Sequence, residues 1–364
     1  FLEYEDKNPS DIIEVHNRPA YIEQIKKYSS SKLILYFHND PLTMSGSKTI
    51  NDRKLLLSKV DHFIFNSNWS LERFKIGLND FNYYKNNFSV VYQSVNKPKI
   101  NFNKKKNVIS FIGKLNRAKG YDVFGGSIIK ILNKYKDWKA IVIGDEPREK
   151  ISFQHKRLIN YGYKDHKFIL KKLENTSISV ICSRWNEPLG RASLEACSRG
   201  SVPIITNRGG LPETSKSALI IKHLNTKKLF TAIETLILDK KKLRKLQHDN
   251  YKNFNFTPNL IAKKIELIRE NLIPVRKFNI INQKSKIKIL HITNFNERHN
   301  GRLHYNTGRR LNNGFVRNNH TVFTLSDRDI IHNSKTITDI TGTQAFNKKI
   351  IKINETFKPD LIVI

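Results

Sequence analysis

Short apolar runs that end in turn residues recur along this sequence, and they alternate with amphipathic stretches of helical spacing. The runs 33–37 and 63–65 end in His38-Asn39-Asp40-Pro41 and Asn66-Ser67-Asn68, and residues 52–59 between them carry leucines at helical spacing. Such alternation is typical of βαβ units, which build parallel sheets. The sequence therefore predicts an α/β protein made of Rossmann-like parts.

The pattern stops and restarts twice, and these breaks predict the division into domains. In order, the predicted parts are an N-terminal Rossmann-like domain at 1–96, a polar linker at 97–107, a C-terminal Rossmann-like domain at 108–278 and the partial first half of another at 279–364. The first part lacks its opening strands, and the chain ends on an apolar strand, so both ends are expected to be fragment boundaries.

Individual elements follow from the same pattern. In the second domain we expect strands at 108–112, 140–143, 177–182 and 202–206, and helices at 190–199, about 226–250 and 257–272. In the last part we expect strands at 287–292, 321–325 and 360–364, a helix at 303–316, and a strand-end turn at Asp327-Arg328-Asp329. In an open parallel sheet, ligands bind where the carboxyl ends of the strands meet.

Composition excludes several classes of protein. Hydrophobic residues make up 38% of the 364 residues, enough for packed cores, so the chain is not disordered. No stretch approaches the about 20 apolar residues of a membrane span. Two cysteines, Cys182 and Cys197, cannot form a disulfide framework, and we expect no signal peptide, because the opening residues FLEYEDKNPS contain no apolar run. These features predict a cytoplasmic location.

The charge is strongly positive, because 65 Lys and Arg face 32 Asp and Glu, a formal net charge of +33. Two explanations stay open: a solvated basic surface, since most cations are scattered, or an anionic partner such as a membrane face or a polyphosphate substrate. The dense runs are residues 104–106 and 240–245. We expect no nucleic-acid partner, and peripheral association with the inner face of an anionic membrane is compatible with this charge.

The segment from Ser183 to Gly190 lies between a predicted strand and a predicted helix. The first N–H groups of a helix lack intrahelical partners and suit phosphate, and a glycine such as Gly190 lets an anion approach the backbone. Glu187 and Glu195, spaced E-x7-E across this junction, would accept hydrogen bonds from hydroxyls at the two ends of a diphosphate ligand. Judged by spacing alone, the alternative is that neither glutamate binds a ligand and that the two have only structural roles, as a helix cap and as a solvated side chain.

Two further strand ends carry candidate residues. In the segment from Gly113 to Gly120, Lys114 and Lys119 lie five residues apart at a sheet edge, which suits a diphosphate, although lysines are common everywhere in this chain. Gly209-Gly210 closes the strand at 202–206 and is expected to shape the same crevice. Gly144-Asp145 ends a neighbouring strand, where a purely structural turn is the equal alternative.

These segments resemble a known family. EPLGRASLEACSRGSVPIITNRGGLPE resembles the donor-binding signature of family-4 glycosyltransferases of the GT-B fold, and GKLNRAKG matches that family's Gly-Arg-Leu…Lys-Gly element. The resemblance covers about 1–275 and implies two Rossmann-like domains that face each other across a cleft, with 257–272 as a helix crossing back over the first. The last part, with RLHYNTGRRLNNGFVRNNH, resembles the start of a second GT-B-like glycosyltransferase; alternatively, it completes the truncated first domain.

The resemblance also implies roles for single residues. The implied donor-binding residues are Lys114 and Lys119 at the diphosphate together with Gly113 and the backbone of Leu189 and Gly190, Glu195 at the ribose hydroxyls, Asp145 and Ser183 on the nucleotide side, and Gly209 and Gly210. Glu187 would contact the transferred sugar near its anomeric carbon. The family usually has Arg where Lys114 stands, and Lys lacks the planar guanidinium fork.

On the acceptor side, YFHND matches a strand-end His of the family that reaches the sugar, so His38 joins Glu187 as a candidate catalytic residue. A role in capping the turn is the alternative for His38. His16, in EVHNRP at the end of the preceding strand, and Asn39 are candidates for contact with the acceptor.

The implied activity is transfer of a hexose-type sugar from a nucleotide diphosphate-sugar to an acceptor hydroxyl, with retention at the anomeric carbon, no metal site and no cofactor besides the donor. The acceptor would be a glycan or a lipid-linked molecule in cell-surface glycan or lipopolysaccharide synthesis. The alternative is a non-catalytic basic Rossmann-like protein that binds nucleic acid or an anionic membrane, against which the two carboxylates in the predicted groove argue.

Overall fold

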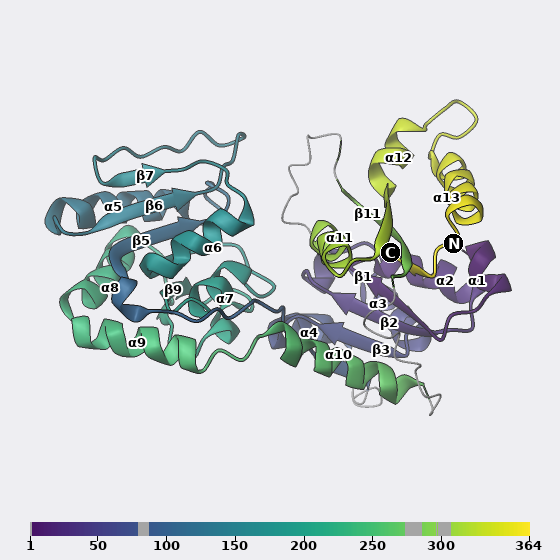
Figure 1. The fold of residues 1–364 in the computed structure, drawn as a ribbon, viewed down its shortest axis with the longest axis horizontal. Helices are drawn as coiled ribbons and strands as arrows, with labels where there is room; N and C mark the ends of the chain where they lie inside the picture. The colour runs from purple at the N-terminus through teal and green to yellow at the C-terminus, as the bar shows by residue number, and fades with distance from the viewer. Residues whose placement is uncertain (1, 79–86, 274–285, 296, 298–306) are drawn as a thin grey trace. The chain divides into compact units, whose positions relative to one another are not determined.

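The computed structural model describes residues 2–78, 87–273, 286–295, 297 and 307–364. In this part of the chain the strands form three sheets, and the paired strands run parallel (Figure 1). The α/β class with parallel sheets, predicted from the alternation of apolar runs and amphipathic stretches, is confirmed.

The first sheet has four strands in the order β1-β2-β3-β4. They are β1 (Ile12–His16), β2 (Lys32–Phe37), β3 (His62–Phe65) and β4 (Phe88–Val90). The helices of this region are α1 (Leu2–Lys7), α2 (Ile22–Tyr28), α3 (Ile50–Lys59) and α4 (Asn68–Lys75). Phe63 and Phe65 pack against Phe74 of α4, with ring centroids 5.3 and 5.4 Å away, so the aromatic side of β3 holds the helix that follows it.

The second sheet has six strands in the order β10-β9-β8-β5-β6-β7. They are β5 (Lys106–Ile112), β6 (Lys139–Ile143), β7 (Leu158–Asn160), β8 (Thr176–Ile181), β9 (Val202–Thr206) and β10 (Leu219–Ile221). Alternate residues of these strands point to opposite faces. Ile109 and Phe111 join a core with α5 (Tyr121–Lys134) and α8 (Thr226–Leu238), whereas Ile141 and Ile143 pack with α6 (His166–Asn175) and α7 (Arg191–Cys197).

One of the predicted helices is divided into two helices in the structure. The stretch expected as a single helix at about 226–250 divides into α8 and α9 (Lys240–Lys252) at Asp239. The backbone of Asp239 leaves the helical region at φ −97° and ψ 81°, and its side chain accepts a hydrogen bond from the N–H of Lys242 at 2.8 Å. Asp239 therefore caps a new helix, which amphipathic spacing alone does not reveal. The next helix, α10 (Pro258–Leu272), lies where it was predicted.

The third sheet has the order β12-β11-β13. Its elements are β11 (Lys288–Thr293), α11 (Thr307–Arg317), β12 (Thr321–Ser326), α12 (Asp327–Asn333), α13 (Thr343–Phe357) and β13 (Leu361–Val363). The prediction of a strand-end turn at Asp327-Arg328-Asp329 is wrong, because these residues form the first turn of α12. Acidic residues there complement the positive end of the helix dipole. Residues 303–306 of the predicted helix at 303–316 lie outside the described residues.

The chain forms two compact units. One consists of residues 1–36, 54–62 and 269–364, and the other of residues 37–53 and 63–268. Residues near both ends of the chain thus belong to the first unit, and the domain boundaries drawn from the sequence stay predictions. Among the helices that the structure describes, none combines the length and the apolar character needed to cross a bilayer.

Candidate functional site

Three loops that follow β5, β8 and β9 meet at one edge of the six-stranded sheet. The three strands are neighbours and parallel, so the loops after them come together. The N–H groups of Arg184 and Trp185 both donate to the carbonyl oxygen of Ala118, at 2.8 and 3.1 Å. The N–H of Gly210 donates to the carbonyl oxygen of Glu187 at 2.7 Å. The structure therefore brings the three predicted motifs into one site.

Lys119 and Glu187 form an ion pair within this site. The Nζ of Lys119 donates to Oε1 of Glu187, and the side chains are 31% and 13% exposed. The family resemblance predicts that Lys119 contacts the diphosphate of the donor and that Glu187 contacts its sugar. Their contact means that a phosphate bound by Lys119 would lie next to the carboxylate expected to contact the sugar. This matches the donor, in which the sugar is bonded directly to the diphosphate.

Lys114 is an exposed cation in the loop after β5. Close to it, Glu146 accepts hydrogen bonds from Arg148 at 2.8 and 3.0 Å. These bonds, together with the smaller effect of the charge on Lys114, hold the pKa of Glu146 at about 2. Apart from its two chain neighbours, none of the described residues has an atom within 4 Å of a Cβ placed on Gly113. The loop thus presents an exposed cation next to a glycine at this edge of the sheet.

Glu195 is buried in α7, where His166 and Arg191 are among its partners. Its Oε1 lies 2.8 Å from Nε2 of His166 and accepts a hydrogen bond from Nε of Arg191 at 2.9 Å. Sequence reasoning missed both partners. Arg191 could have been found, because residues four apart face each other on a helix. No spacing in the sequence points to His166, which begins α6 and reaches Glu195 only through the packing of α6 with α7.

The two glycines of the third motif hold the backbone of the Glu187 loop. Gly209 has φ +61°, and a Cβ there would overlap the carbonyl oxygen of Glu187. Residues 187 and 209 also form a parallel bridge. Only glycine permits both the conformation and the close approach. Gly209 and Gly210 thus act on the position of Glu187, which sharpens the expectation that they shape the crevice.

The neighbouring predicted residues have mixed surroundings. Ser183 is buried, and its hydroxyl donates to the carbonyl oxygen of Ala118 at 3.2 Å, whereas Asp145 is exposed. Leu189 is buried with Leu194 in a small core. Gly190 has φ +105°, and a Cβ there would overlap the side chain of Leu211. Conformation and packing therefore explain Gly190 without reference to a ligand, and its contact with phosphate stays a prediction.

The N-terminus of α4 lies against the same loops. Ser67 caps α4 through a hydrogen bond from the N–H of Ser70 at 3.0 Å, and its hydroxyl donates to the carbonyl oxygen of Pro188. Glu213, in the 3₁₀ turn η5 (Leu211–Thr214), accepts hydrogen bonds from the N–H groups of Asn68 and Trp69 at 2.7 and 2.8 Å. Two loops of the site are therefore fastened to one helix end.

His38 directly follows β2, and its carbonyl oxygen accepts a hydrogen bond from Nδ2 of Asn66 at 2.8 Å. The side chain that caps the turn is that of Asp40, which accepts from the N–H of Leu42 at 3.0 Å. Asn39 is exposed. The roles of His38 as a catalytic residue and of Asn39 at the acceptor stay predictions.

His16 ends β1 in the unit that contains residues 1–36. Its Nε2 lies 3.6 Å from Glu14, which also accepts from Arg269 at 2.7 and 2.9 Å. Burial would raise the pKa of Glu14, but His16 and Arg269 outweigh it and lower the pKa to about 2. The expected contact of His16 with the acceptor stays a prediction.

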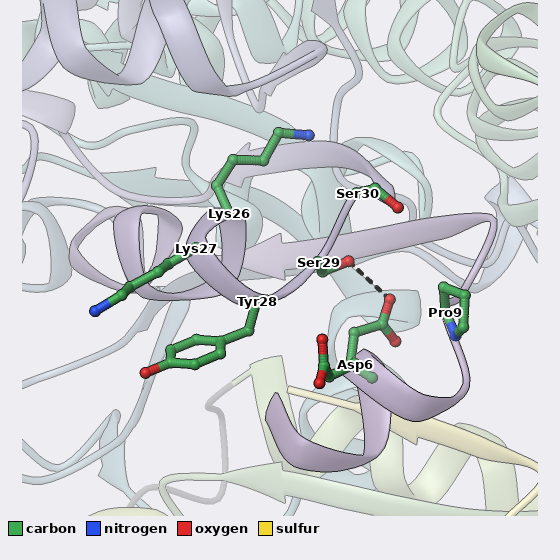
Figure 2. Close-up of a pocket in the computed structure, with 8 residues that line it drawn as sticks. Asp6, Pro9, Lys26, Lys27, Tyr28, Ser29 and Ser30 are labelled. Atoms are coloured by element: carbon green, nitrogen blue, oxygen red, sulfur yellow. Dashed lines mark hydrogen bonds between the residues drawn. The ribbon is translucent and has the colours of Figure 1, made fainter.

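A cavity of about 620 Å³ lies between α1 and the end of α2 (Figure 2). Its walls include Glu5, which accepts hydrogen bonds from the hydroxyls of Ser10 and Ser29 at 2.7 and 2.8 Å. None of the residues predicted for function line it. Among the described residues, no group of three or more His, Cys, Asp or Glu is arranged to hold a metal ion.

Comparisons with known proteins show a likeness to glycosyltransferases. Residues 93–253 match the family described as Glycosyl transferases group 1. The chain is 28% identical over 302 residues to YtcC of Bacillus subtilis, a candidate glycosyltransferase, spanning 72% of this chain and 73% of YtcC. It is 25% identical over 274 residues to Spore coat protein SA of the same organism, spanning 66% of this chain and 72% of that protein.

Solved structures show the same fold. HepE of Anabaena, whose crystal structure contains UDP-glucose, superposes with a TM-score of 0.60 at 16% identity, covering 74% of this chain and 80% of HepE. The predicted GT-B fold, with Rossmann-like domains built on parallel sheets, is confirmed. Together with the match over residues 93–253, it supports a GT-B glycosyltransferase.

Proposed function

We propose that this protein transfers a sugar from a nucleotide diphosphate-sugar to an acceptor hydroxyl. The observation that carries the proposal is the ion pair of Lys119 with Glu187, at a sheet edge that also presents Lys114. A cation for the diphosphate, Lys119, and a carboxylate for the adjoining sugar, Glu187, lie next to each other there. The crystal structure of HepE with UDP-glucose makes uridine diphosphate sugars the first donors to test.

In this proposal the cations bind the charged diphosphate of the donor, and the carboxylates bind hydroxyl groups of its sugars. Lys114 and Lys119, with the backbone N–H groups of Leu189 and Gly190, stabilise the diphosphate as it leaves, and no divalent cation is required. Glu187 and His38 contact the transferred sugar near the anomeric carbon, which keeps its configuration. Glu195 accepts hydrogen bonds from the ribose hydroxyls. Asp145 and Ser183 line the nucleotide.

The wider setting is also proposed. We place the enzyme in family 4 and in cell-surface glycan or lipopolysaccharide synthesis, on a glycan or lipid-linked acceptor. The relation to Spore coat protein SA, which is named for a surface structure, supports this setting. The net charge of +33 supports a cytoplasmic enzyme that associates peripherally with the anionic inner face of the membrane. Residues 279–364 are proposed as the start of a second GT-B-like module.

Transfer from UDP-glucose and related nucleotide sugars tests the site. Glu187→Gln and Lys114→Ala should each lower the transfer rate, whereas Glu72→Gln and Lys241→Ala, at exposed positions on α4 and α9, should leave it unchanged. Wild-type rates in both site variants would show that the site is assigned wrongly. A non-catalytic polyanion binder would instead show binding that falls steeply with salt and no protection by nucleoside diphosphates.

A further inference from the structure

The carboxylate of Glu195 is held from two separate elements. Arg191 reaches it from one turn earlier on α7, and His166 reaches it from the first residue of α6. Both contacts converge on the same oxygen, Oε1. The side chain of Glu195 is 6% exposed and that of His166 is 36% exposed, so a partly exposed imidazole contacts a buried carboxylate.

Charge compensation alone does not require His166. A buried carboxylate needs a paired cation, and Arg191 supplies one on the same helix. A contact from the same helix leaves a carboxylate more freedom to rotate about its terminal bond than contacts from two directions, because a donor on another element restricts its orientation further. His166 provides that second contact.

The position of the imidazole is itself fixed by the backbone. Asp165 caps α6 by accepting a hydrogen bond from the N–H of Phe168 at 2.8 Å, which sets where the helix begins. Ile169 and Leu173 of α6 pack with Ala196 of α7 in one buried cluster. The helix that carries His166 and the helix that carries Glu195 therefore keep their relative position, and the 2.8 Å contact joins two rigid elements.

We propose that His166 is a positioning residue that orients Glu195 toward the ribose of the donor and thereby makes the enzyme select ribonucleotides over 2′-deoxyribonucleotides. This inference rests on the proposed function, in which Glu195 accepts hydrogen bonds from the ribose. An ionised carboxylate only accepts, so Nε2 of His166 carries the proton in their contact. A vicinal diol presents two O–H donors in a fixed relation, and an acceptor of fixed orientation distinguishes it best from a sugar with one hydroxyl.

The test is calorimetric binding to the full chain. The probe is whichever of UDP, GDP and ADP the wild type binds best, compared with its 2′-deoxy form. A lost hydrogen bond to a charged group weakens binding roughly 10- to 150-fold, so the wild type should prefer the ribonucleotide within that range. His166→Ala should reduce the preference to about threefold or less. With the nucleotide sugar, KM should rise while kcat changes little, because the ribose does not react.

Two variants separate orientation from folding. In His166→Gln the amide nitrogen lies near the place of Nε2 and can donate, so the preference for ribose should persist. In His166→Asn the amide is too short to reach Glu195, so the preference should be lost. His223→Ala, at an exposed histidine, is the matched control and should behave as the wild type.

The outcomes distinguish the two proposals. A wild type that binds no nucleoside diphosphate overturns the proposed function, and the inference with it. A wild type that prefers the ribonucleotide, with the same preference in His166→Ala and His166→Asn, overturns the role of His166 alone. A lowered melting temperature with an unchanged preference would assign His166 to stability only.

Discussion

The backbone N–H of Gly210 donates to the carbonyl oxygen of Glu187 at 2.7 Å. This bond links the loop after β9 to the loop after β8, two segments that are 23 residues apart in the sequence, counted from 210 − 187. It explains why two glycines follow β9: the chain approaches the Glu187 loop so closely that side chains do not fit. The carboxylate proposed to face the sugar is therefore positioned by a neighbouring loop.

Gly209→Ala should damage both stability and transfer. The new Cβ would overlap the carbonyl oxygen of Glu187 and would hold φ +61°, which costs about 1–2 kcal/mol before any overlap. A displaced Glu187 should lower the transfer rate on the order of 100-fold. Gly162→Ala is the matched control for stability, because Gly162 has φ +63° but open space around it. Equal losses of unfolding free energy in the two variants would show that the overlap is unimportant.

Lys119 and Glu187 should separate in their effects on binding and on transfer. Lys119→Ala removes a cation from the diphosphate and should weaken the binding of a nucleoside diphosphate roughly 10- to 150-fold. Glu187→Gln should leave that binding intact, since the ligand has no sugar and Lys119 is released from its ion pair, yet it should abolish most transfer. Calorimetry with the nucleoside diphosphate and a transfer assay measure the two effects. Equal weakening of binding in both variants would contradict the assignment.

Glu213 should be important for both stability and binding. It accepts hydrogen bonds from two N–H groups at the start of α4 and from the hydroxyl of Tyr92, at 3.0 Å. Glu213→Ala should lower the free energy of unfolding by about 1–2 kcal/mol, the usual loss for a helix cap, and should weaken donor binding because Pro188 is fastened to the same helix end. Urea unfolding measures the first effect.

The control for Glu213 is Glu72→Ala, on the exposed side of α4. Glu72 pairs with Lys75 at 2.7 Å and its side chain is 65% exposed, so little stability should be lost. If Glu213→Ala had the same free energy of unfolding as Glu72→Ala, the hydrogen bonds of Glu213 to the start of α4 would contribute nothing to stability.

His291, on β11, should make the first unit sensitive to acid. Burial lowers its pKa to about 4, with Asn312 raising and His16 lowering it by smaller amounts. Between the unfolded value of 6.5 and about 4, the unfolded state binds more protons than the folded state. The free energy of unfolding should therefore fall as the pH falls through this range, by at most roughly 3 kcal/mol.

His291→Phe should remove this acid sensitivity and keep the packing of the ring against Phe295 and Phe315, whose centroids are both 5.5 Å away. Urea unfolding of wild type and variant at about pH 7 and about pH 4.5 gives the comparison. His332→Gln, at an exposed histidine, should behave as the wild type. An unchanged pH dependence in His291→Phe would exclude His291 as its source.

Local pattern was sufficient for most elements, because apolar runs bounded by glycine or polar turns form strands almost wherever they occur. It failed at Asp239, where a cap divides one amphipathic stretch into two helices, and at Asp327, where an acidic strand end begins a helix. At Asp239, a non-helical backbone conformation and one hydrogen bond to the N–H of Lys242 decide the outcome, and at Asp327 the acidic residues stand in the first turn of the new helix. Neither alters the hydrophobic spacing on which the prediction depends.

The sequence by itself determined the parallel α/β fold and the three segments after β5, β8 and β9 that make up the site, because strand ends of a parallel sheet share one edge. Only the tertiary structure paired Lys119 with Glu187 and brought His166 to Glu195. These partners are 68 and 29 residues apart, so their contact depends on how loops and helices pack and not on any local spacing. The residue types specify the chemistry, and the packing decides which of them act together.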